Sequence, residues 1–385
     1  MKKLIATIAA ITLCAALGFA GGGKDGSAPG ASDTITIGAV LTTSGQNAFY
    51  GTESRDGALL AIEDINKAGG VLGKKLALIA EDDESDASKA VNAFTKLSTR
   101  DKVSYIIGCS LSGTTMAITA QAQAAKIVLI SPSATNAKVT DPGEFIFRAC
   151  FIDPFQGIVA ANFANDTLKA KKAAVLYDAG SDYNTGLATE FKKNFQAIGG
   201  TIVADEAYQT GDVDFNAQVT RIKASAPDVV YLPNYYQDVS LQAKQLRAQG
   251  VNTPLLGGDG WDSLVANAGD EVLNGFWTSF FSKDSTAPKA QAFVKAYEAR
   301  FNKPANSFSA LGYDCAMLIA DAIKAAGSTD STAVAAALAK ISGDYVTGNI
   351  RFDAHRDPIK GAVINEIVKK DGKLVDSYKT TVNPK

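Results

Sequence analysis

The segment from Val103 to Thr135 constrains the fold more than any other part of the chain. It contains two short apolar runs, Val103–Ile107 and Ile127–Ile130, and each is followed by a turn rich in serine and threonine. The residues between the runs, Met116–Ala125, are mostly alanine and glutamine, which favour a helix. Strand, helix and strand in this order form a βαβ unit, whose two strands run parallel. The sequence therefore predicts an α/β fold built on a parallel sheet.

The two polar turns of this unit lie where open α/β sheets bind their ligands. The first turn includes Ser110, Ser112 and Thr114, and the second runs from Ser131 to Thr135. Both turns leave the carboxyl ends of neighbouring strands, which is the ligand edge of such sheets. Hydroxyl groups and free N–H groups at a helix start suit an anion such as a carboxylate. The same residues could also serve only as helix N-caps, so the turns alone leave both interpretations open.

Length, composition and charge exclude several classes of protein. The 385 residues are enough for two domains, and 46% hydrophobic with 20% charged residues is ordinary for a globular protein. The formal net charge is −2 and the sequence has no basic patch, so we expect no nucleic-acid partner. The single histidine, His355, argues against histidine metal sites and a histidine-dependent triad, and we assign it no role.

The N-terminus is typical of a secretory signal peptide over residues 1–20. Lys2–Lys3 precede the apolar run Leu4–Leu17, and Gly18–Ala20 is a small-x-small cleavage site. Residues 21–32 are rich in glycine and predict a flexible linker. We expect an exported, periplasmic protein. The cysteine that would carry a lipid anchor does not follow the cleavage site, so we prefer a free exported protein. A membrane-anchored lipoprotein stays the alternative. No later stretch is long enough to span a membrane.

Three cysteines follow the signal peptide, namely Cys109, Cys150 and Cys315. An odd number leaves at least one free thiol, and the spacing has no zinc pattern. Cys150 and Cys315 stand in apolar contexts and are expected in the core. We therefore expect no essential disulfide and no metal site.

The alternation of strands and helices continues on both sides of the opening unit. It predicts a first β-α-β-α-β-α-β series and then a second series of the same kind, each with a sheet covered on both faces. The predicted strands are 34–41, 76–81, 103–107, 127–130, 145–148, 173–177, 201–208, 228–232, 254–256, 276–281, 349–352, 363–368 and 374–379. The predicted helices are 51–66, one capped by Ser85 or Asp86 and ending at 98, 116–125, 153–168, 185–198, 216–225, 239–249, 288–301, 312–326 and 331–341. The acidic run at 82–86 is interpreted as a solvated strand end beside a helix N-terminus, not as a metal site.

The motifs of common enzyme classes are missing from this sequence. No GxGxxG follows a strand, and there is no GxxxxGK[ST] loop, which removes the main support for dinucleotide or nucleotide binding. There is also no GxSxG elbow and no Cys/His pair placed for nucleophilic chemistry. We therefore expect a protein that is not an enzyme and needs no cofactor. A two-domain α/β enzyme is the rival interpretation, and turnover of a substrate would reveal it.

The order of motifs resembles the periplasmic leucine/isoleucine/valine-binding proteins of bacterial ABC importers, which have the type I solute-binding fold. The resemblance runs from about Thr34 to Tyr378. It is carried by AFYGTESRDGALLAIEDINKAGGVLGKKL, EDDESD, YIIGCSLSGTT, ISPSAT, FRACFIDPFQG, YDAGSDYNTGL, YLPNYY and GGDGW.

The resemblance implies two Rossmann-like α/β domains with parallel sheets, joined by a three-segment hinge. The first domain would hold 33–152 plus 282–358, and the second 153–281 plus 359–385. The chain would cross between them near 150–153, 278–283 and 357–360. The resemblance also implies a monomer.

The resemblance assigns ligand contacts to individual residues. Ser112 and Thr135 match the hydroxyl ligands of the family, and Asp259 stands where the family has an acid for the ligand ammonium. The other assigned residues line the two turns (Ser110, Leu111, Ser133, Ala134), match the second-domain tyrosines (Tyr183, Tyr235) or border the side-chain pocket (Tyr50, Trp261).

These assignments also suit the chemistry of an amino acid. Its carboxylate needs N–H and O–H donors, which the two turns offer, and its ammonium needs a carboxylate, which Asp259 offers. The sequence departs from well-known members at three places: Ser85 and Leu111 replace a cysteine pair, Asp259 is shorter than the usual glutamate, and Trp261 is bulky. These departures leave the side chain of the bound amino acid open.

The sequence therefore predicts a solute-binding protein that captures a free amino acid in the cleft between its domains and delivers it to a membrane permease. Branched-chain or other aliphatic amino acids are expected. One alternative is a sensory module that presents its ligand to a membrane receptor. Another is a binder of a different small solute, such as an amide, urea or an aromatic acid.

Overall fold

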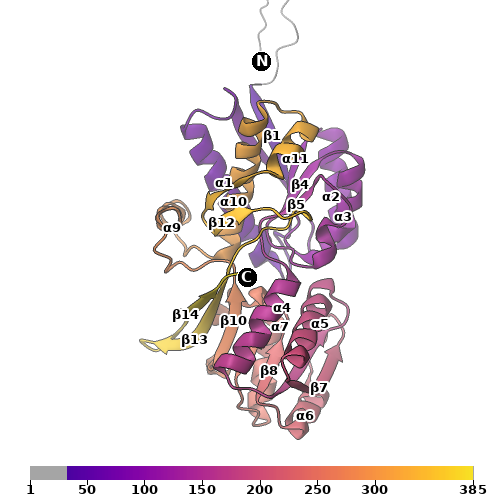
Figure 1. Cartoon of the computed structure of the whole chain (residues 1–385), viewed down its shortest axis with the longest axis vertical. Helices are drawn as coiled ribbons and strands as arrows, with labels where there is room; N and C mark the ends of the chain where they lie inside the picture. The colour runs from indigo at the N-terminus through magenta and orange to yellow at the C-terminus, as the bar shows by residue number, and fades with distance from the viewer. Residues whose placement is uncertain (1–32, 385) are drawn as a thin grey trace, which may run out of the picture. The chain divides into compact units, whose positions relative to one another are not determined.

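The computed structural model describes residues 33–384, and these residues form an α/β fold in which strands and helices alternate (Figure 1). The fold class is therefore the one that the sequence predicts. The predicted signal peptide (1–20) and linker (21–32) lie outside the described residues.

The first sheet contains five strands, all parallel, in the order β2-β1-β3-β4-β5. Its strands are β1 (Thr34–Leu41), β2 (Lys75–Asp82), β3 (Tyr105–Gly108), β4 (Val128–Ser131) and β5 (Ile146–Arg148). Strands β3 and β4 pair in parallel from Tyr105 opposite Val128, so the opening βαβ prediction is confirmed. The polar turns after these two strands lie side by side as a result.

The second sheet has the order β14-β13-β10-β9-β8-β6-β7, and its neighbours from β10 to β7 are parallel. Strands β13 and β14 form an antiparallel hairpin added beside β10. The strands are β6 (Lys172–Asp178), β7 (Thr201–Tyr208), β8 (Val229–Leu232), β9 (Leu255–Gly257), β10 (Gly275–Ser279), β13 (Ala362–Lys370) and β14 (Lys373–Val382). The predicted turn near Asp371–Gly372 joins the two hairpin strands.

The helices form separate groups around the two sheets (Figure 1). Helices α1, α10 and α11 pack together beside the first sheet, α2 packs on α3, and α4 packs on α5 beside the second sheet. The helices are α1 (Ala48–Lys67), α2 (Ala87–Thr95), α3 (Ser112–Ala124), α4 (Asp153–Asn162), α5 (Asp182–Ala197), α6 (Asn216–Ser225), α7 (Tyr236–Ala248), α8 (Leu264–Asn267), α9 (Pro288–Phe301), α10 (Ser307–Ala326) and α11 (Ser331–Leu338). We call β1–β5 with α1–α3 and α9–α11 the first lobe, and β6–β10, β13 and β14 with α4–α8 the second lobe. The domain boundaries and the three hinge crossings stay predictions.

Helices α1 and α10 touch backbone to backbone at two glycines. A Cβ atom on Gly57 would lie 1.9 Å from the Ser309 carbonyl oxygen, and one on Gly312 would lie 2.0 Å from the Ser54 carbonyl oxygen. Because only a residue without a side chain fits such a distance, these glycines set how closely the two longest helices of the first lobe approach.

Several helices begin earlier than the sequence predicts. Helix α1 begins at Ala48 instead of 51, α3 at Ser112 instead of 116, α7 at Tyr236 instead of 239 and α10 at Ser307 instead of 312. Their first turns carry serine, threonine or tyrosine and lack the apolar periodicity that marks a helix. The sequence also missed strand β11 (Ser342–Tyr345), which pairs with β12 (Gly348–Arg351).

For the acidic run at the end of β2, the structure confirms the predicted helix cap but not the predicted exposure to solvent. Asp86 caps α2 by accepting a hydrogen bond of 2.9 Å from the backbone N–H of Lys89, which confirms the capping prediction. Asp83, however, is fully buried and accepts a hydrogen bond of 2.5 Å from the Thr42 hydroxyl. A solvated strand end is therefore wrong for this residue, because its carboxylate ties the chain after β1 to the chain after β2.

Two further findings concern the surface and the membrane. Among the described residues no helix has both the length and the apolar composition needed to cross a membrane.

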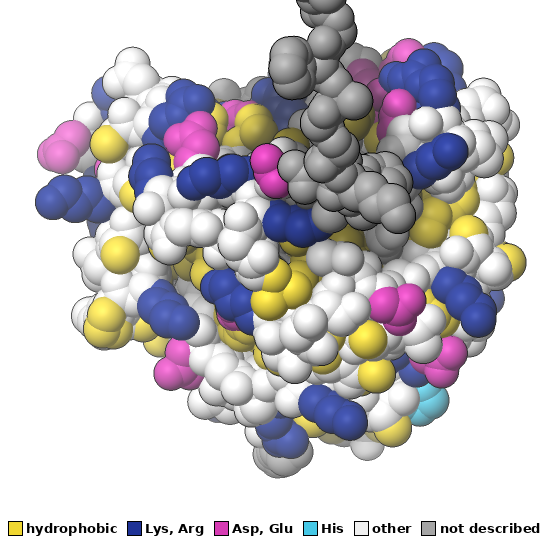
Figure 2. All heavy atoms as spheres, turned by 90° about the horizontal axis from the view of Figure 1, so that it is seen from above, with side chains coloured by type: hydrophobic (Ala, Val, Ile, Leu, Met, Phe, Trp, Pro, Cys, Tyr) yellow, Lys and Arg dark blue, Asp and Glu magenta, His cyan; other side chains and the backbone are white. Residues whose placement is uncertain are grey.

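On the face seen in Figure 2, lysine and arginine side chains lie scattered among acidic and uncharged ones. A nucleic-acid backbone is bound by a continuous basic strip, and this face does not offer one.

Candidate ligand-binding site

The first polar turn leads directly into the N-terminus of α3. Leu111 is the N-cap of this helix, and no side chain caps it. The threonine hydroxyls of the first turn point back, since Thr115 donates to the Leu111 carbonyl at 2.7 Å. The backbone N–H groups that precede Thr115 at the start of α3 have no acceptor within the helix, as at any helix start. The N-cap interpretation of the serines is therefore wrong here, and the amides of this turn are available to an anion.

The second polar turn is bonded to the first. The Ser133 hydroxyl donates to the Ser110 carbonyl at 2.7 Å, and the Asn136 backbone N–H donates to the Ser112 hydroxyl at 3.3 Å. The predicted turn residues Ser110, Leu111, Ser112, Ser133, Ala134 and Thr135 are all buried. The structure thus brings together the turns that the sequence predicts to bind a carboxylate.

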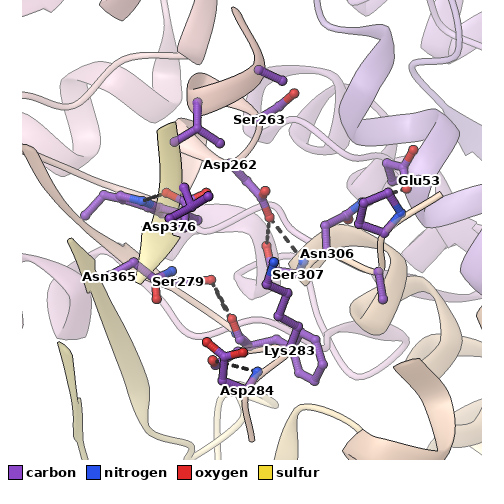
Figure 3. Close-up of a pocket in the computed structure, with 18 of the residues that line it drawn as sticks. Glu53, Asp262, Ser263, Ser279, Lys283, Asp284, Asn306, Ser307, Asn365 and Asp376 are labelled. Carbon is purple, nitrogen blue, oxygen red and sulfur yellow. Dashed lines mark hydrogen bonds between the residues drawn. The ribbon is translucent and has the colours of Figure 1, made fainter. Parts of the chain in front are cut away.

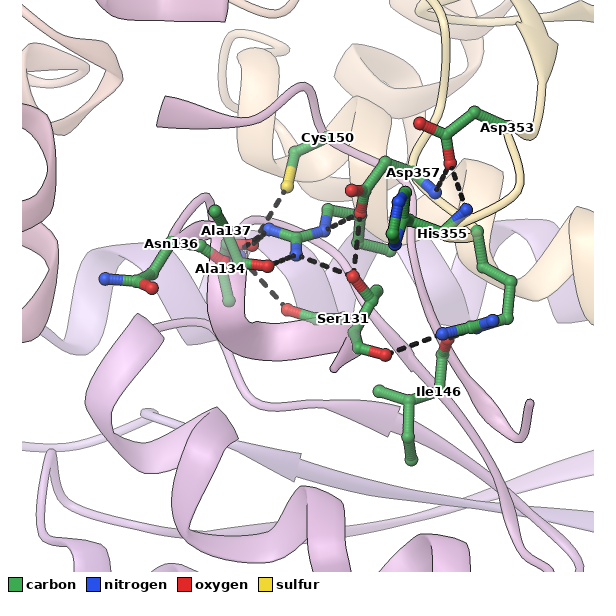
Figure 4. Close-up of polar contacts among 12 residues, drawn as sticks. Ser131, Ala134, Asn136, Ala137, Ile146, Cys150, Asp353, His355 and Asp357 are labelled. Carbon is green, nitrogen blue, oxygen red and sulfur yellow. Dashed lines mark hydrogen bonds and ion pairs between the residues drawn. The ribbon is translucent and has the colours of Figure 1, made fainter. Parts of the chain in front are cut away.

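A fully buried arginine holds the second turn in place. Arg148 donates from Nη1 to the carbonyl oxygens of Ala134 and Asn136, both at 2.8 Å. Its Nε lies 2.7 Å from the Asp357 carboxylate, so an ion pair balances its charge. Figure 4 shows Ala134, Asn136 and Asp357, the partners of Arg148, on the same side of the first lobe. Since Asp357 lies in the third predicted hinge crossing, Arg148 links that crossing to the turn.

The second lobe contributes a buried carboxylate at the end of β9. Asp259 is 3% exposed, and its Oδ1 accepts from the Gln156 side-chain amide at 2.9 Å and from the Tyr183 hydroxyl at 3.1 Å. The Asp259 backbone N–H donates back to Gln156 Oε1 at 2.9 Å. The Thr278 hydroxyl donates to the same Gln156 oxygen. These contacts fix the position of the carboxylate but supply no positive charge.

The charge of Asp259 is therefore costly. Burial raises the pKa of this carboxyl to about 7, although the hydrogen bonds from Gln156 and Tyr183 oppose the rise. A cation bound beside Asp259 would restore its ionised form. An ammonium group is such a cation, and its N–H groups donate hydrogen bonds to a carboxylate.

Aromatic side chains from both lobes meet beside this carboxylate. The Tyr183 ring stacks on Tyr235 with centroids 4.9 Å apart, and Tyr50 lies 5.3 Å from Tyr235. Tyr50 belongs to the first lobe, and its hydroxyl donates to the Gly260 carbonyl of the second lobe at 2.7 Å. The two lobes are thus in contact at the predicted site.

Some buried polar atoms near these turns have no hydrogen-bond partner among the described residues. They are Ser110 Oγ, Thr135 Oγ1, both carboxylate oxygens of Asp153 and Tyr231 Oη. Buried polar atoms are nearly always paired in native proteins, so a polar ligand is the natural partner for such a group.

The family of the chain follows from comparison with known proteins. The family model described as periplasmic binding protein matches residues 34–373. The chain belongs to this family. It is 35% identical over 332 residues to the leucine-, isoleucine-, valine-, threonine- and alanine-binding protein of Pseudomonas aeruginosa, covering 85% of this chain and 88% of that protein.

Two solved structures of periplasmic binding proteins support the same conclusion. The leucine-binding protein LivK of Thermotoga maritima superimposes with a TM-score of 0.86 at 32% identity, covering 91% of this chain and 99% of that one. The branched-chain amino acid transporter substrate-binding protein LivJ of Streptococcus pneumoniae, solved with isoleucine, gives 0.83 at 36% identity, covering 91% and 100%. The type I fold implied by the sequence is confirmed.

One predicted site residue of this periplasmic binding protein lies elsewhere. Trp261 is fully buried, and its indole N–H donates to the Leu232 carbonyl at 2.9 Å. Its ring packs so closely on Gly257 that a Cβ there would lie 2.0 Å from it. The indole therefore fills the core of the second lobe, and we leave it out of the proposed ligand contacts.

Sequence reasoning missed three residues that the structure places near the site. Gln156 orients Asp259, while Asp153 and Tyr231 carry the unpartnered oxygens. Both Asp153 and Gln156 lie in the FIDPFQG segment, where an acid and an amide stand at the start of a helix. The full burial of Gln156 marks it as a residue of the site, but burial cannot be read from one sequence.

A separate pocket of about 370 Å³ lies between the lobes and contains none of the predicted ligand residues. Figure 3 shows Asp262 of this pocket beside Ser307, whose hydroxyl donates to it at 2.5 Å. Asp376 accepts from the Trp277 indole N–H at 2.8 Å. Asp262 and Asp376 of this pocket are thus engaged by protein donors. Within residues 33–384, no group of three or more His, Cys, Asp or Glu side chains could hold a metal ion.

Proposed function

We propose that the protein captures a free amino acid outside the cytoplasm and delivers it to the permease of an ABC importer. The bound amino acid is branched-chain or otherwise aliphatic. Ser110, Ser112, Ser133 and Thr135 with the adjoining amides bind its carboxylate, and Asp259 binds its ammonium.

The observation that carries this proposal is that the first lobe offers hydrogen-bond donors for an anion, while the second lobe offers a carboxylate for a cation. The first lobe offers the uncapped α3 N-terminus and the unpartnered hydroxyls of Ser110 and Thr135. The second lobe offers the buried Asp259 with no cation beside it among the described residues. A zwitterion complements both halves, whereas a simple carboxylate would leave Asp259 unneutralised.

The aromatic groups and the relatives favour an aliphatic ligand. Tyr50, Tyr183 and Tyr235 present apolar ring faces that exclude water. The named Pseudomonas relative binds leucine, isoleucine, valine, threonine and alanine, and the Streptococcus structure contains isoleucine. These ligands share a small, uncharged side chain.

A thermal-shift screen of the refolded protein tests the proposal. The probes are the twenty amino acids, together with desamino analogues such as 4-methylpentanoate, which is leucine without its amine. Unfolding and refolding first removes any ligand that co-purified. Binding to the native state raises the melting temperature by mass action, by several degrees when the ligand is about a hundredfold above its dissociation constant. Shifts with leucine, isoleucine or valine support the proposal, and shifts only with amine-free carboxylates or amides contradict it.

A further inference from the structure

Asp153 is the most deeply buried acid near the site that has no partner. It is the first residue of α4 and is 1% exposed. Its backbone N–H donates to the Thr135 carbonyl at 2.9 Å, which holds it against the second polar turn. Neither carboxylate oxygen has a hydrogen-bond partner in the described part of the chain. Acids are common in the first turn of a helix, but there they normally bond to backbone amides or water.

The surroundings of Asp153 hold its carboxylate without satisfying it. Gly186 of α5 leaves room for it, since a Cβ on this glycine would lie 2.9 Å from Asp153 Oδ2. The Thr135 side chain lies close enough to lower the pKa of Asp153, but burial dominates and raises this pKa to about 8. The charged groups that influence Asp153 or share the nearby pocket come from four elements: Asp259, Arg148, Glu190, Asp182 and Lys138. Arg148 is already paired with Asp357, and no ion pair joins Lys138 to Asp153 among the described residues.

We infer that Asp153 is a second carboxylate of the ligand site, which binds the ammonium of the amino acid together with Asp259 and so selects ligands with an amine. This inference rests on the proposed function. Its geometric basis is the position of Asp153 against Thr135, with two buried oxygens that no charged side chain among the described residues pairs with.

One ammonium group can donate hydrogen bonds to two acids. An ammonium has three N–H donors, and Asp259 can accept only part of them because its Oδ1 already accepts from Gln156 and Tyr183. Asp153 and the Thr135 hydroxyl supply further acceptors. A ligand without an amine would leave two buried acids beside its apolar or anionic groups, and both would have to stay protonated.

Calorimetric titration of Asp153→Asn with two matched probes tests the inference. The probes are L-leucine and 4-methylpentanoate, which differ only in the amine. The amide keeps the size of the side chain but carries no negative charge. We expect about a 10- to 100-fold loss of leucine affinity, the range for a lost hydrogen bond to a charged group. The affinity for 4-methylpentanoate should stay unchanged or rise.

The control is Asp376→Asn, which alters a different acid whose pKa burial raises to about 7. Asp376 lies in the separate pocket, so both affinities should stay unchanged in this variant. Equal losses for both probes in Asp153→Asn, or no loss for leucine, would overturn the inference while the proposed function stands. A wild-type protein that binds only the amine-free probe would instead refute the proposed function.

A crystal structure of the wild-type protein with leucine decides the matter if the variant does not fold. The inference requires an Asp153 oxygen within hydrogen-bond distance of the ligand nitrogen, about 2.7–3.2 Å. An ammonium that contacts Asp259 and leaves Asp153 out of reach would overturn it.

Discussion

Asp259 is a buried acid whose charge no described side chain balances, which suits its proposed role in binding a cation. Gln156 and Tyr183 hold the carboxylate still, but neither carries a charge. The cost of burying the acid is therefore met only in part before a ligand binds. Such preorganisation at a fixed position is how a binding site gains affinity from one contact.

We expect Asp259→Ala to weaken leucine binding by about 2–5 kcal/mol, because the ligand ammonium would lose a buried charged partner. Calorimetric titration measures the change. The exposed Asp270, which pairs with Lys369 at the surface, provides the control, and Asp270→Ala should leave affinity unchanged. Unchanged leucine affinity in Asp259→Ala would remove this residue from the site.

At the scale of elements, the contact between α1 and α10 makes the first lobe a compact support for the site. Tyr50 lies in the first turn of α1, and Phe308 in the first turn of α10 packs 4.7 Å from the Tyr50 ring. The close approach at Gly57 and Gly312 therefore fixes where the aromatic part of the site stands relative to the sheet.

Replacing Gly312 by alanine should destabilise the protein by about 1–3 kcal/mol. The new Cβ would lie 2.0 Å from the Ser54 carbonyl, and this clash outweighs the better helix propensity of alanine. Urea unfolding measures the difference. Gly113→Ala in α3 is the matched control, because its Cβ would lie 3.5 Å from the nearest atom, the Asp182 carboxylate. A Gly312→Ala protein as stable as this control would contradict the packing argument.

The sequence predicted the elements well where apolar periodicity marks them. Strand β7, helix α6 and helix α9 have the predicted bounds, and both polar turns follow the predicted strands. It failed at the starts of α1, α3, α7 and α10, since polar and aromatic first turns carry no periodic signal. Of the residues predicted to contact a ligand, those of the two turns lie together, and Tyr183 lies beside Asp259. The orientation of Trp261 depends on its packing against Gly257, which no local sequence pattern reveals.

At the scale of the whole described molecule, hydrogen bonds join the lobes at separate places. Tyr50 reaches Gly260, Ser307 reaches Asp262, and the Asn136 side chain donates to the Asp182 carbonyl at 2.8 Å. These contacts involve helix α1, the residue after the second polar turn and the separate pocket. Opening of the lobes would therefore break contacts on more than one side of the ligand site.

The buried acids predict how stability depends on pH. Among the carboxyls whose folded-state pKa burial raises, four stand out: the pKa reaches about 8 for Asp153, about 7 for Asp259 and Asp376, and about 6 for Asp262. Their unfolded values lie near 4, so between pH 4 and 8 the folded state binds more protons than the unfolded state. The free energy of unfolding of the ligand-free protein should therefore fall as pH rises from 5 to 8.

Melting temperatures at pH 5, 6, 7 and 8 check this expectation. The double variant Asp262→Asn with Asp376→Asn should show a shallower fall, because two of the four acids no longer titrate. Stability that rises across this range would show that these carboxyls are ionised in the folded protein.

The three cysteines of the described chain bear on how motion between the lobes can be observed. Cys109, Cys150 and Cys315 are free and fully buried, and burial raises the pKa of each thiol, to about 12 for Cys150. A thiol reagent is attacked by an exposed thiolate, so these buried, protonated side chains should stay unreactive in the folded protein. Residues 33–384 of the wild-type chain thus already serve as an unreactive background for fluorescent labelling. One new surface cysteine in each lobe would give a dye pair whose energy transfer reports closure, without any change to the native core.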